Sequence, residues 1–134
     1  MTIMHGYMEV EVTLKQIDYL ENTQKEYPKV VGYLLEDSLE YIEKETGNKH
    51  IITFSSDLIR FLNEGEYSSD TKLMDEPGET IVYSPYGNMK FISKLIESDK
   101  NDEFWSVEYQ LFEGDKIITH QKMIWEFKKV HQSS

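Results

Sequence analysis

The chain has 134 residues and a formal net charge of −11, with 39% hydrophobic and 13% aromatic residues. This length and composition predict one folded domain over residues 1–134 and argue against an intrinsically disordered chain. The negative charge argues against nucleic acid and anionic membranes as partners, because both would repel the protein.

Cysteine is absent from the sequence, so neither disulfides nor thiolate metal sites are expected. The N-terminal stretch MTIMHGYMEVEV lacks the basic and apolar regions of a signal peptide. The longest apolar run, VVGYLL, is much shorter than the ~18–20 residues that cross a membrane. We therefore expect a cytoplasmic protein.

The first predicted element covers residues 8–15, where Val10, Val12 and Leu14 share one face and charged side chains occupy the other. The same two-residue period predicts further strands at 30–35, 39–44, 50–54, 58–63, 80–83, 89–96, 104–112 and 117–127. Alanine is absent, and β-branched and aromatic residues are abundant. The composition therefore favours an all-β fold of about nine strands.

Residues 35–46, LEDSLEYIEKET, carry a mixed signal. Their Glu and Leu content suits a helix, but Leu39 and Tyr41 alternate with polar neighbours, so we interpret the segment as a strand. Residues 67–77 are polar, and a closed sheet could splay open there.

Turn residues separate the predicted strands. Gly47 and Gly114 lie in TGNK and EGDK, which are typical of tight hairpins. Pro77 and Gly78 fit the centre of a type II turn. Strands at this spacing, joined by hairpins, indicate an antiparallel up-and-down barrel or a sandwich.

The stretch YSPYGNMKF, residues 83–91, could be an active-site loop or a corner of a sheet. A catalytic serine needs a neighbouring base and usually a strained turn, as in G-x-S-x-G, and Ser84 has no such context. Pro85 forces an extended conformation on Ser84, and Gly87 allows a positive φ. We therefore predict a corner after Tyr83 and no catalytic serine.

Arg60 is the only arginine in the chain. Alternation places it on the same face as Leu58 and Leu62. A buried arginine needs a partner, so Arg60 either pairs with a carboxylate near a barrel end or anchors an acidic ligand inside a barrel.

The aromatic residues suggest a pocket, because a barrel of this size can enclose one small ligand. Tyr83, Trp105, Tyr109 and Trp125 would line it together with Arg60, although they could equally form a packed core. We expect no metal site, because His5, His50, His120 and His131 lack a ligand spacing, and no cofactor.

Four motifs, ETGNKHIITF, IRFLNEGE, YSPYGNMKF and VEYQLFEGDKIITHQKMIWEF, occur in an order and spacing that resemble the YwiB-like family of small bacterial proteins. The resemblance covers about residues 8–128. Ser84 stands where the family has threonine. The resemblance implies a closed, calycin-like (lipocalin-like) β-barrel of about 8–10 antiparallel strands. It implies no activity, because the family has no known function.

These observations support an intracellular protein that binds a small, partly apolar or acidic ligand inside a barrel. The alternative is a non-catalytic interaction module whose acidic surface docks a basic protein. An enzyme is not favoured, because no nucleophile–base pair or phosphate loop is present, but a barrel interior could still assemble acids and bases from separate strands.

Overall fold

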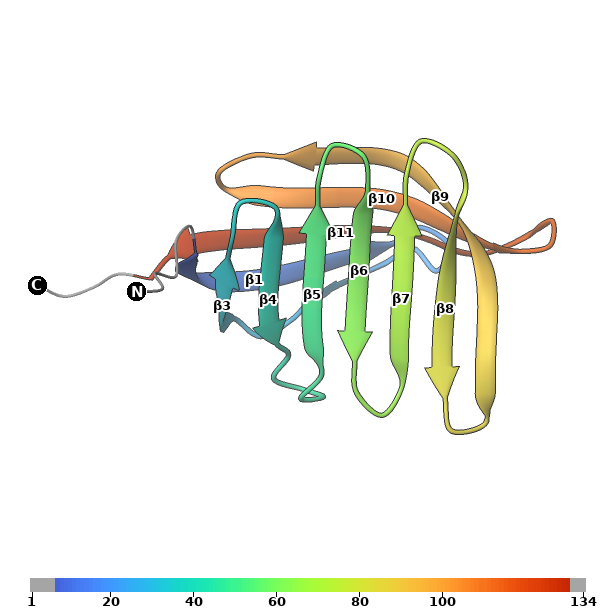
Figure 1. Cartoon of the computed structure of the whole chain (residues 1–134), viewed down its shortest axis with the longest axis horizontal. Coiled ribbons are helices and arrows are strands. Elements are labelled where there is room, and N and C mark those ends of the chain that lie inside the picture. Colours follow the sequence, from blue (N-terminus) through green and yellow to red (C-terminus); the bar gives the residue numbers. More distant parts are fainter. Residues whose placement is uncertain (1–6, 131–134) are drawn as a thin grey trace, which may run out of the picture.

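The computed structural model describes residues 7–130, which form eleven β-strands and no helix (Figure 1). The expectation about a signal peptide depends partly on residues 1–6, which lie outside the described range. The strands are β1 (Met8–Asp18), β2 (Thr23–Glu26), β3 (Val30–Leu34), β4 (Ser38–Ile42), β5 (Lys49–Phe54), β6 (Ile59–Glu64), β7 (Ser68–Leu73), β8 (Gly78–Ser84), β9 (Gly87–Lys100), β10 (Phe104–Glu113) and β11 (Lys116–Lys129).

All pairings within the described residues are antiparallel, and from β3 to β11 each strand pairs with the next one along the chain. The last strand returns to the first, because β11 pairs with β1 from Val10↔Lys129 to Asp18↔Gln121. This seam closes ten strands into a ring of hydrogen bonds, and β2 pairs with the end of β1 beside β3. The up-and-down arrangement expected from the hairpins is confirmed.

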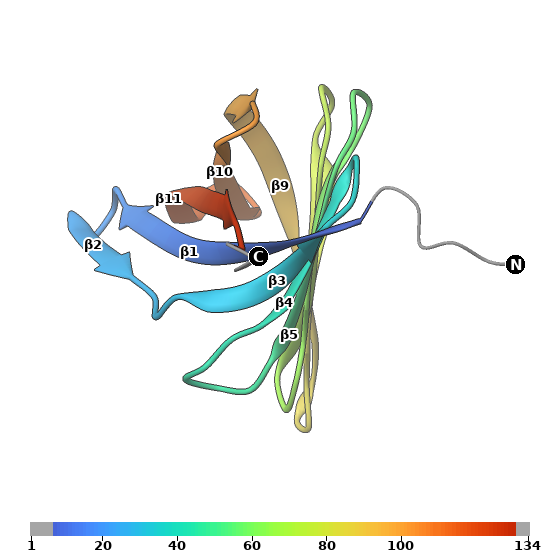
Figure 2. The same ribbon diagram turned by 90° about the vertical axis from the view of Figure 1, so that its left-hand side faces the viewer.

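The ring has two layers, which face each other across the core. The strands β3–β8 stand side by side in one layer, and β1, β10 and β11 run across their direction behind it (Figure 1). Figure 2 shows the first layer edge-on and the second leaning away from it. The long strand β9 belongs to both layers, because its start pairs with β8 and its end with β10.

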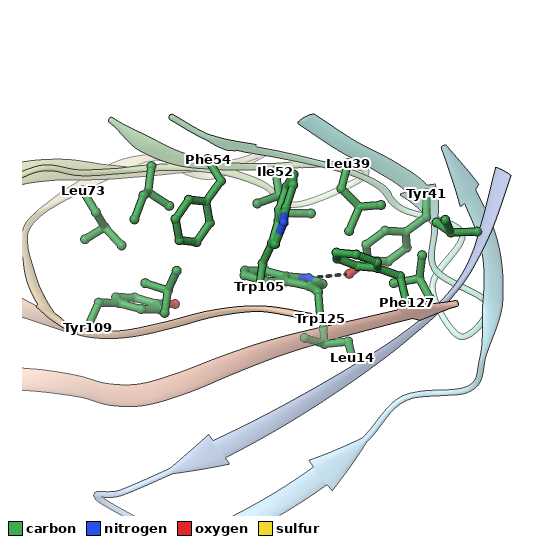
Figure 3. Close-up of a cluster of buried hydrophobic side chains, with 14 of the residues drawn as sticks. Leu14, Leu39, Tyr41, Ile52, Phe54, Leu73, Trp105, Tyr109, Trp125 and Phe127 are labelled. Atoms are coloured by element: carbon green, nitrogen blue, oxygen red, sulfur yellow. Dashed lines mark hydrogen bonds between the residues drawn. The ribbon is translucent and has the colours of Figure 1, made fainter. Parts of the chain in front are cut away.

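The period-2 alternation puts one face of each strand inside the ring. Trp105, Tyr109, Trp125 and Phe127 point inward and are buried, as their spacing predicts (Figure 3). Val107 is also buried in this core. The aromatic rings pack in two groups: Trp105 with Phe54 and Phe127, and Phe61 with Tyr109 and Trp125. Aromatic side chains therefore fill the middle of the ring.

Strand β7 was not predicted, because its inward positions carry polar residues and give no apolar alternation. Ser69 and Thr71 face inward there, with Leu73 as the apolar member. The strand is hydrogen-bonded to β6 and β8, so residues 67–77 do not open the ring. The sequence left open whether this segment splays, and pairing on both sides of β7 shows that it does not.

Strand β2 lies in the polar connection after β1 and was also not predicted. Its four residues are exposed, and β1 is the only strand that it pairs with among the described residues. These two strands raise the number to eleven, above the expected 8–10. In contrast, the strand interpretation of residues 35–46 is confirmed, because β4 occupies the centre of that segment.

The glycine turns are mostly as expected. Gly47 and Gly114 have φ of 75° and 62° in their hairpins. Gly78 is not the glycine of a type II turn, because its φ is not positive and it begins β8. It is required for space instead: a Cβ at Gly78 would lie 2.2 Å from the Lys72 carbonyl oxygen.

The YSPYG stretch is a tight hairpin between β8 and β9. Ser84 pairs with Gly87, which has a φ of 130°. The Ser84 hydroxyl donates to the Gly87 carbonyl (2.8 Å) and accepts from the Tyr86 amide (3.2 Å). The predicted corner is confirmed, and the serine hydroxyl is engaged in holding the turn.

Candidate functional site

Among the hollows of the described residues, two are lined by tryptophan side chains of the aromatic core. One is a cavity of about 220 Å³ with many polar side chains, which we call the polar cavity. The other is a wider groove of about 650 Å³ at the end where β1 begins. The polar cavity has the stronger signs of a site, because burying polar side chains is costly unless they have partners.

A row of side chains crosses β4 to β7, and its members on β5, β6 and β7 line one wall of the polar cavity. Antiparallel register brings Tyr41, His50, Asn63 and Ser69 into line, each opposite the next. All four have the inward phase of their strands. Residues in such a row have neighbouring Cβ atoms about 5 Å apart, so their side chains act on one another directly.

On this side of the cavity, Glu43 is hydrogen-bonded to His50. Glu43, just after β4, accepts a hydrogen bond from His50 Nε2 (3.0 Å), and its second oxygen accepts from the Thr46 hydroxyl (3.1 Å). The Tyr41 ring stacks flat on the His50 ring, with centroids 4.9 Å apart. Burial lowers the pKa of His50 below its usual value, despite the opposing effect of Glu43. Burial therefore favours the neutral form of His50.

The opposite wall comes from β1, β10 and β11. Tyr27 donates its hydroxyl hydrogen to Gln16 (2.8 Å), Gln16 donates to Gln121, and Gln121 donates to the Tyr109 hydroxyl. Burial raises the pKa of Tyr109 to about 12, so its hydroxyl stays protonated. The chain links three strands and the segment after β2 through side-chain hydrogen bonds.

Asn63 supplies an unpaired acceptor. Its Oδ1 atom is buried and has no hydrogen-bond partner among the described residues, and the side chain lines the cavity. A buried carbonyl oxygen without a donor costs about 1–3 kcal/mol. A ligand or water that donates a hydrogen bond to this atom would recover that free energy.

A cluster of three hydroxyl side chains extends from the cavity into the core. Thr71 lines the cavity, and its hydroxyl accepts from Thr80 (3.0 Å). The Thr80 hydroxyl is also 2.6 Å from the hydroxyl of Ser93, which is fully buried. These three hydroxyls satisfy one another across β7, β8 and β9, where an aliphatic core would otherwise be expected.

The wider groove has an apolar floor that includes Val10, Trp105 and Phe127. Lys100 lies at its edge, but this ammonium group is already paired: it contacts Asp37 Oδ1 (2.6 Å) and the Phe54 carbonyl (2.8 Å). It also lies over the Trp105 ring, 5.1 Å from its centroid. Lys100 therefore ties the end of β9 to the loops beside β4 and β5.

The five residues predicted as a ligand site are not brought together. Trp105, Tyr109 and Trp125 lie inside the ring and are almost fully buried; Tyr109 and Trp125 line the polar cavity, and Trp105 lines the groove. Tyr83 is 40% exposed on the outer face. Arg60 shares the phase of Leu62, as expected, but that face points outward.

Arg60 has the carboxylate partner that its sequence context required. Its Nε and Nη2 atoms donate to the two oxygens of Asp70 at 2.9 and 2.7 Å, in a bidentate pair. The guanidinium holds the pKa of the Asp70 carboxyl below its usual value. Arg60 thus links β6 to β7 on the outer face of the sheet, and its side chain points away from the cavity.

This pair predicts a modest pH dependence of stability. A carboxyl whose pKa is lower in the folded state stabilises the fold above its unfolded pKa of about 3.9, and this stabilisation disappears as the pH falls through the folded value. At neutral pH, Asp70→Asn should lower the free energy of unfolding by less than about 1 kcal/mol, because the Arg60 side chain is 41% exposed. Urea unfolding should show the two proteins converging in acid, and a difference independent of pH would contradict this.

The sequence reasoning missed Gln16, Glu43, His50, Asn63 and Gln121. A signal was present for some of them: His50 has the same phase as Ile52 and Phe54, and Gln121 the same phase as Trp125. Polar residues on the inward phase of a strand mark either a strand end or a site. The row across β4 to β7 required the register, which sequence alone does not provide.

The described residues contain no group of three or more His, Asp or Glu side chains that could hold a metal ion. They also contain no helix long and apolar enough to cross a membrane.

The fold and cavity together define an all-β protein whose antiparallel up-and-down ring is hollow and polar at one end. No family model and no curated protein matches the chain. The crystal structure of the ywiB protein from Bacillus subtilis is similar, with a TM-score of 0.67 and 12% sequence identity over 93% of this chain and 94% of that chain. The chain therefore has a YwiB-like fold, and at this identity the similarity concerns the fold alone.

Proposed function

We propose that this protein is an intracellular, calycin-like β-barrel that binds a small, partly apolar ligand in the polar cavity. The observation that carries the proposal is the unpaired, buried Oδ1 of Asn63 in a cavity where Gln16, Glu43, His50, Thr71, Tyr109 and Gln121 are hydrogen-bonded. Most ligand sites combine apolar walls with a few convergent polar groups.

The composition of the walls supports this proposal. Aromatic and aliphatic side chains supply the apolar surface, among them Phe61, Trp125 and Met123. The hydrogen-bonded side chains of the two walls hold the polar atoms in place before a ligand arrives, which lowers the entropic cost of binding. The volume of about 220 Å³ is below the roughly 300–1,000 Å³ of most ligand pockets, so the proposed ligand is small.

The position of Arg60 changes the expected ligand chemistry. An acidic ligand was expected on the assumption that Arg60 lies inside, whereas it is paired with Asp70 on the outer face. The proposed ligand instead donates hydrogen bonds, because the cavity presents the Asn63 carbonyl oxygen and the Glu43 carboxylate.

Native mass spectrometry of the freshly purified protein tests the proposal. We expect an excess mass that disappears on denaturation, either as purified or after incubation with the small-molecule fraction of a cell extract. Ser69→Leu fills the cavity and should remove the excess mass. The matched control Lys72→Leu, on the outer face of the same strand, should keep it.

Two results would contradict the proposal. One is a wild-type protein without excess mass under both conditions. The other is a folded Ser69→Leu variant that carries the same excess mass as the wild type, since the ligand would then lie elsewhere.

A further inference from the structure

We propose that the ligand of the polar cavity is a small organic cation with N–H donors, a protonated amine, whose charge is balanced by Glu43. This inference rests on the proposed function and specifies its ligand class. Three observations support it: the Glu43 carboxylate in the cavity, the aromatic rings of its walls and the unpaired Oδ1 atom of Asn63.

The charge of the cavity is unbalanced. Glu43 is 8% exposed, and no lysine or arginine is present among the side chains that line the cavity. Burial lowers the pKa of His50, its hydrogen-bond partner, which favours the neutral ring as a donor to Glu43. Buried carboxylates normally have a cationic partner, because desolvating an unpaired charge is very costly.

The lysine whose charge acts on Glu43 is engaged outside the cavity lining. Lys25 forms an ion pair with Glu45 (3.1 Å) and lies over the Tyr27 ring, 4.3 Å from its centroid. Its side chain is about half exposed. Lys25 is thus paired with Glu45 and does not line the cavity, and its charge has only a smaller effect on Glu43.

The walls suit a cation. Rings of Tyr27, Phe61, Tyr109 and Trp125 line the same space as Glu43. The negative face of an aromatic ring attracts a cation by about 0.5–2 kcal/mol, and more strongly when water is excluded. Rings and a carboxylate together favour a cation over a neutral molecule and disfavour an anion.

The acceptor of Asn63 selects a cation that carries N–H groups. A protonated amine has three donors, so one can reach a Glu43 oxygen while another reaches Asn63 Oδ1. A quaternary ammonium ion has none and would leave Asn63 unpaired. A carboxylate ligand would place a second negative charge beside Glu43.

Three probes of similar shape test the charge: benzylamine, benzyl alcohol and benzoate. Isothermal titration calorimetry on the full chain at pH 7 should show benzylamine binding at least tenfold more tightly than benzyl alcohol, and no binding of benzoate. A tenfold ratio corresponds to about 1.4 kcal/mol. Chemical-shift changes in the amide spectrum should centre on the strands around His50 and Asn63.

Variants separate the charge from the shape. Glu43→Gln retains the size of the side chain and should weaken benzylamine binding at least tenfold, with benzyl alcohol unaffected. The control Glu40→Gln removes the same charge from the outer face of β4, where Glu40 lies near Lys49, and should leave binding unchanged. Asn63→Leu should weaken benzylamine binding in the same direction, and thermal unfolding checks that each variant is folded.

The inference would be overturned if benzyl alcohol or benzoate bound as tightly as benzylamine. Failure of benzylamine to bind, or equal binding by wild type and folded Glu43→Gln, would also overturn it. Ligand binding as such would survive these outcomes, because native mass spectrometry tests it independently. A co-purified ligand with no basic nitrogen would overturn the cation inference and support the proposed function.

Discussion

Replacing Trp125 with alanine is expected to lower the free energy of unfolding by about 3–5 kcal/mol, the usual cost of removing a buried tryptophan. Trp125 is 1% exposed and stands at the centre of the ring, where its ring packs on Phe61 with centroids 5.2 Å apart. Its indole N–H donates to the buried Tyr41 hydroxyl (3.1 Å), the dashed line in Figure 3. The substitution therefore leaves a large void and an unpaired hydroxyl.

Urea unfolding followed by circular dichroism measures this loss, and controls isolate its cause. Trp125→Phe should cost less, because the ring remains and only the indole N–H and part of the volume are lost. Tyr33→Ala, at a 43% exposed position on β3, should change stability by about 1 kcal/mol or less. If Trp125→Ala were no more destabilising than Tyr33→Ala, Trp125 would not be a core residue.

Replacing Thr80 with valine is expected to destabilise the protein by about 1–3 kcal/mol, although the two side chains have nearly the same shape. Thr80 is 2% exposed and bonds both Thr71 and Ser93. Valine would leave these two hydroxyls without the partner that they have in the folded state. The loss should appear in the urea midpoint without a change in the slope of the transition.

A combined variant distinguishes this explanation from a packing effect. Thr71→Val, Thr80→Val and Ser93→Ala together remove every member of the group, so the triple variant should be less destabilised than the sum of the three single changes. Thr23→Val on exposed β2 should have almost no effect. Strict additivity would show that the three hydroxyls do not act together.

The strands with apolar inward faces were predictable because a half-buried strand repeats every two residues. β1, β10 and β11 followed directly from Val12, Tyr109 and Trp125 and their neighbours. β2 and β7 were not predictable. All residues of β2 are exposed. In β7 the inward residues Ser69 and Thr71 are small and polar, so the strand has no hydrophobic alternation. Backbone pairing with neighbouring strands holds both in place.

The candidate site was only partly predictable. The aromatic content correctly indicated that Tyr109 and Trp125 lie inside, because large apolar rings are buried wherever a core exists. Arg60 was assigned to the correct phase of β6, but a phase does not specify which face of a sheet points inward. Which face points inward depends on which side of the whole sheet is apolar. Arg60 lies on the opposite, outer side, where it pairs with Asp70.

By itself, the sequence determined the all-β class, most of the strands, the hairpin turns and the aromatic core, because each depends on residues that are neighbours in the chain. Only the tertiary structure decided that β11 closes on β1, and that Glu43, His50 and Asn63 meet Gln16 and Gln121 around one cavity. Those residues lie on separate strands, and their proximity depends on register and on closure of the ring. Both are properties of the complete set of pairings, which no single stretch of sequence encodes.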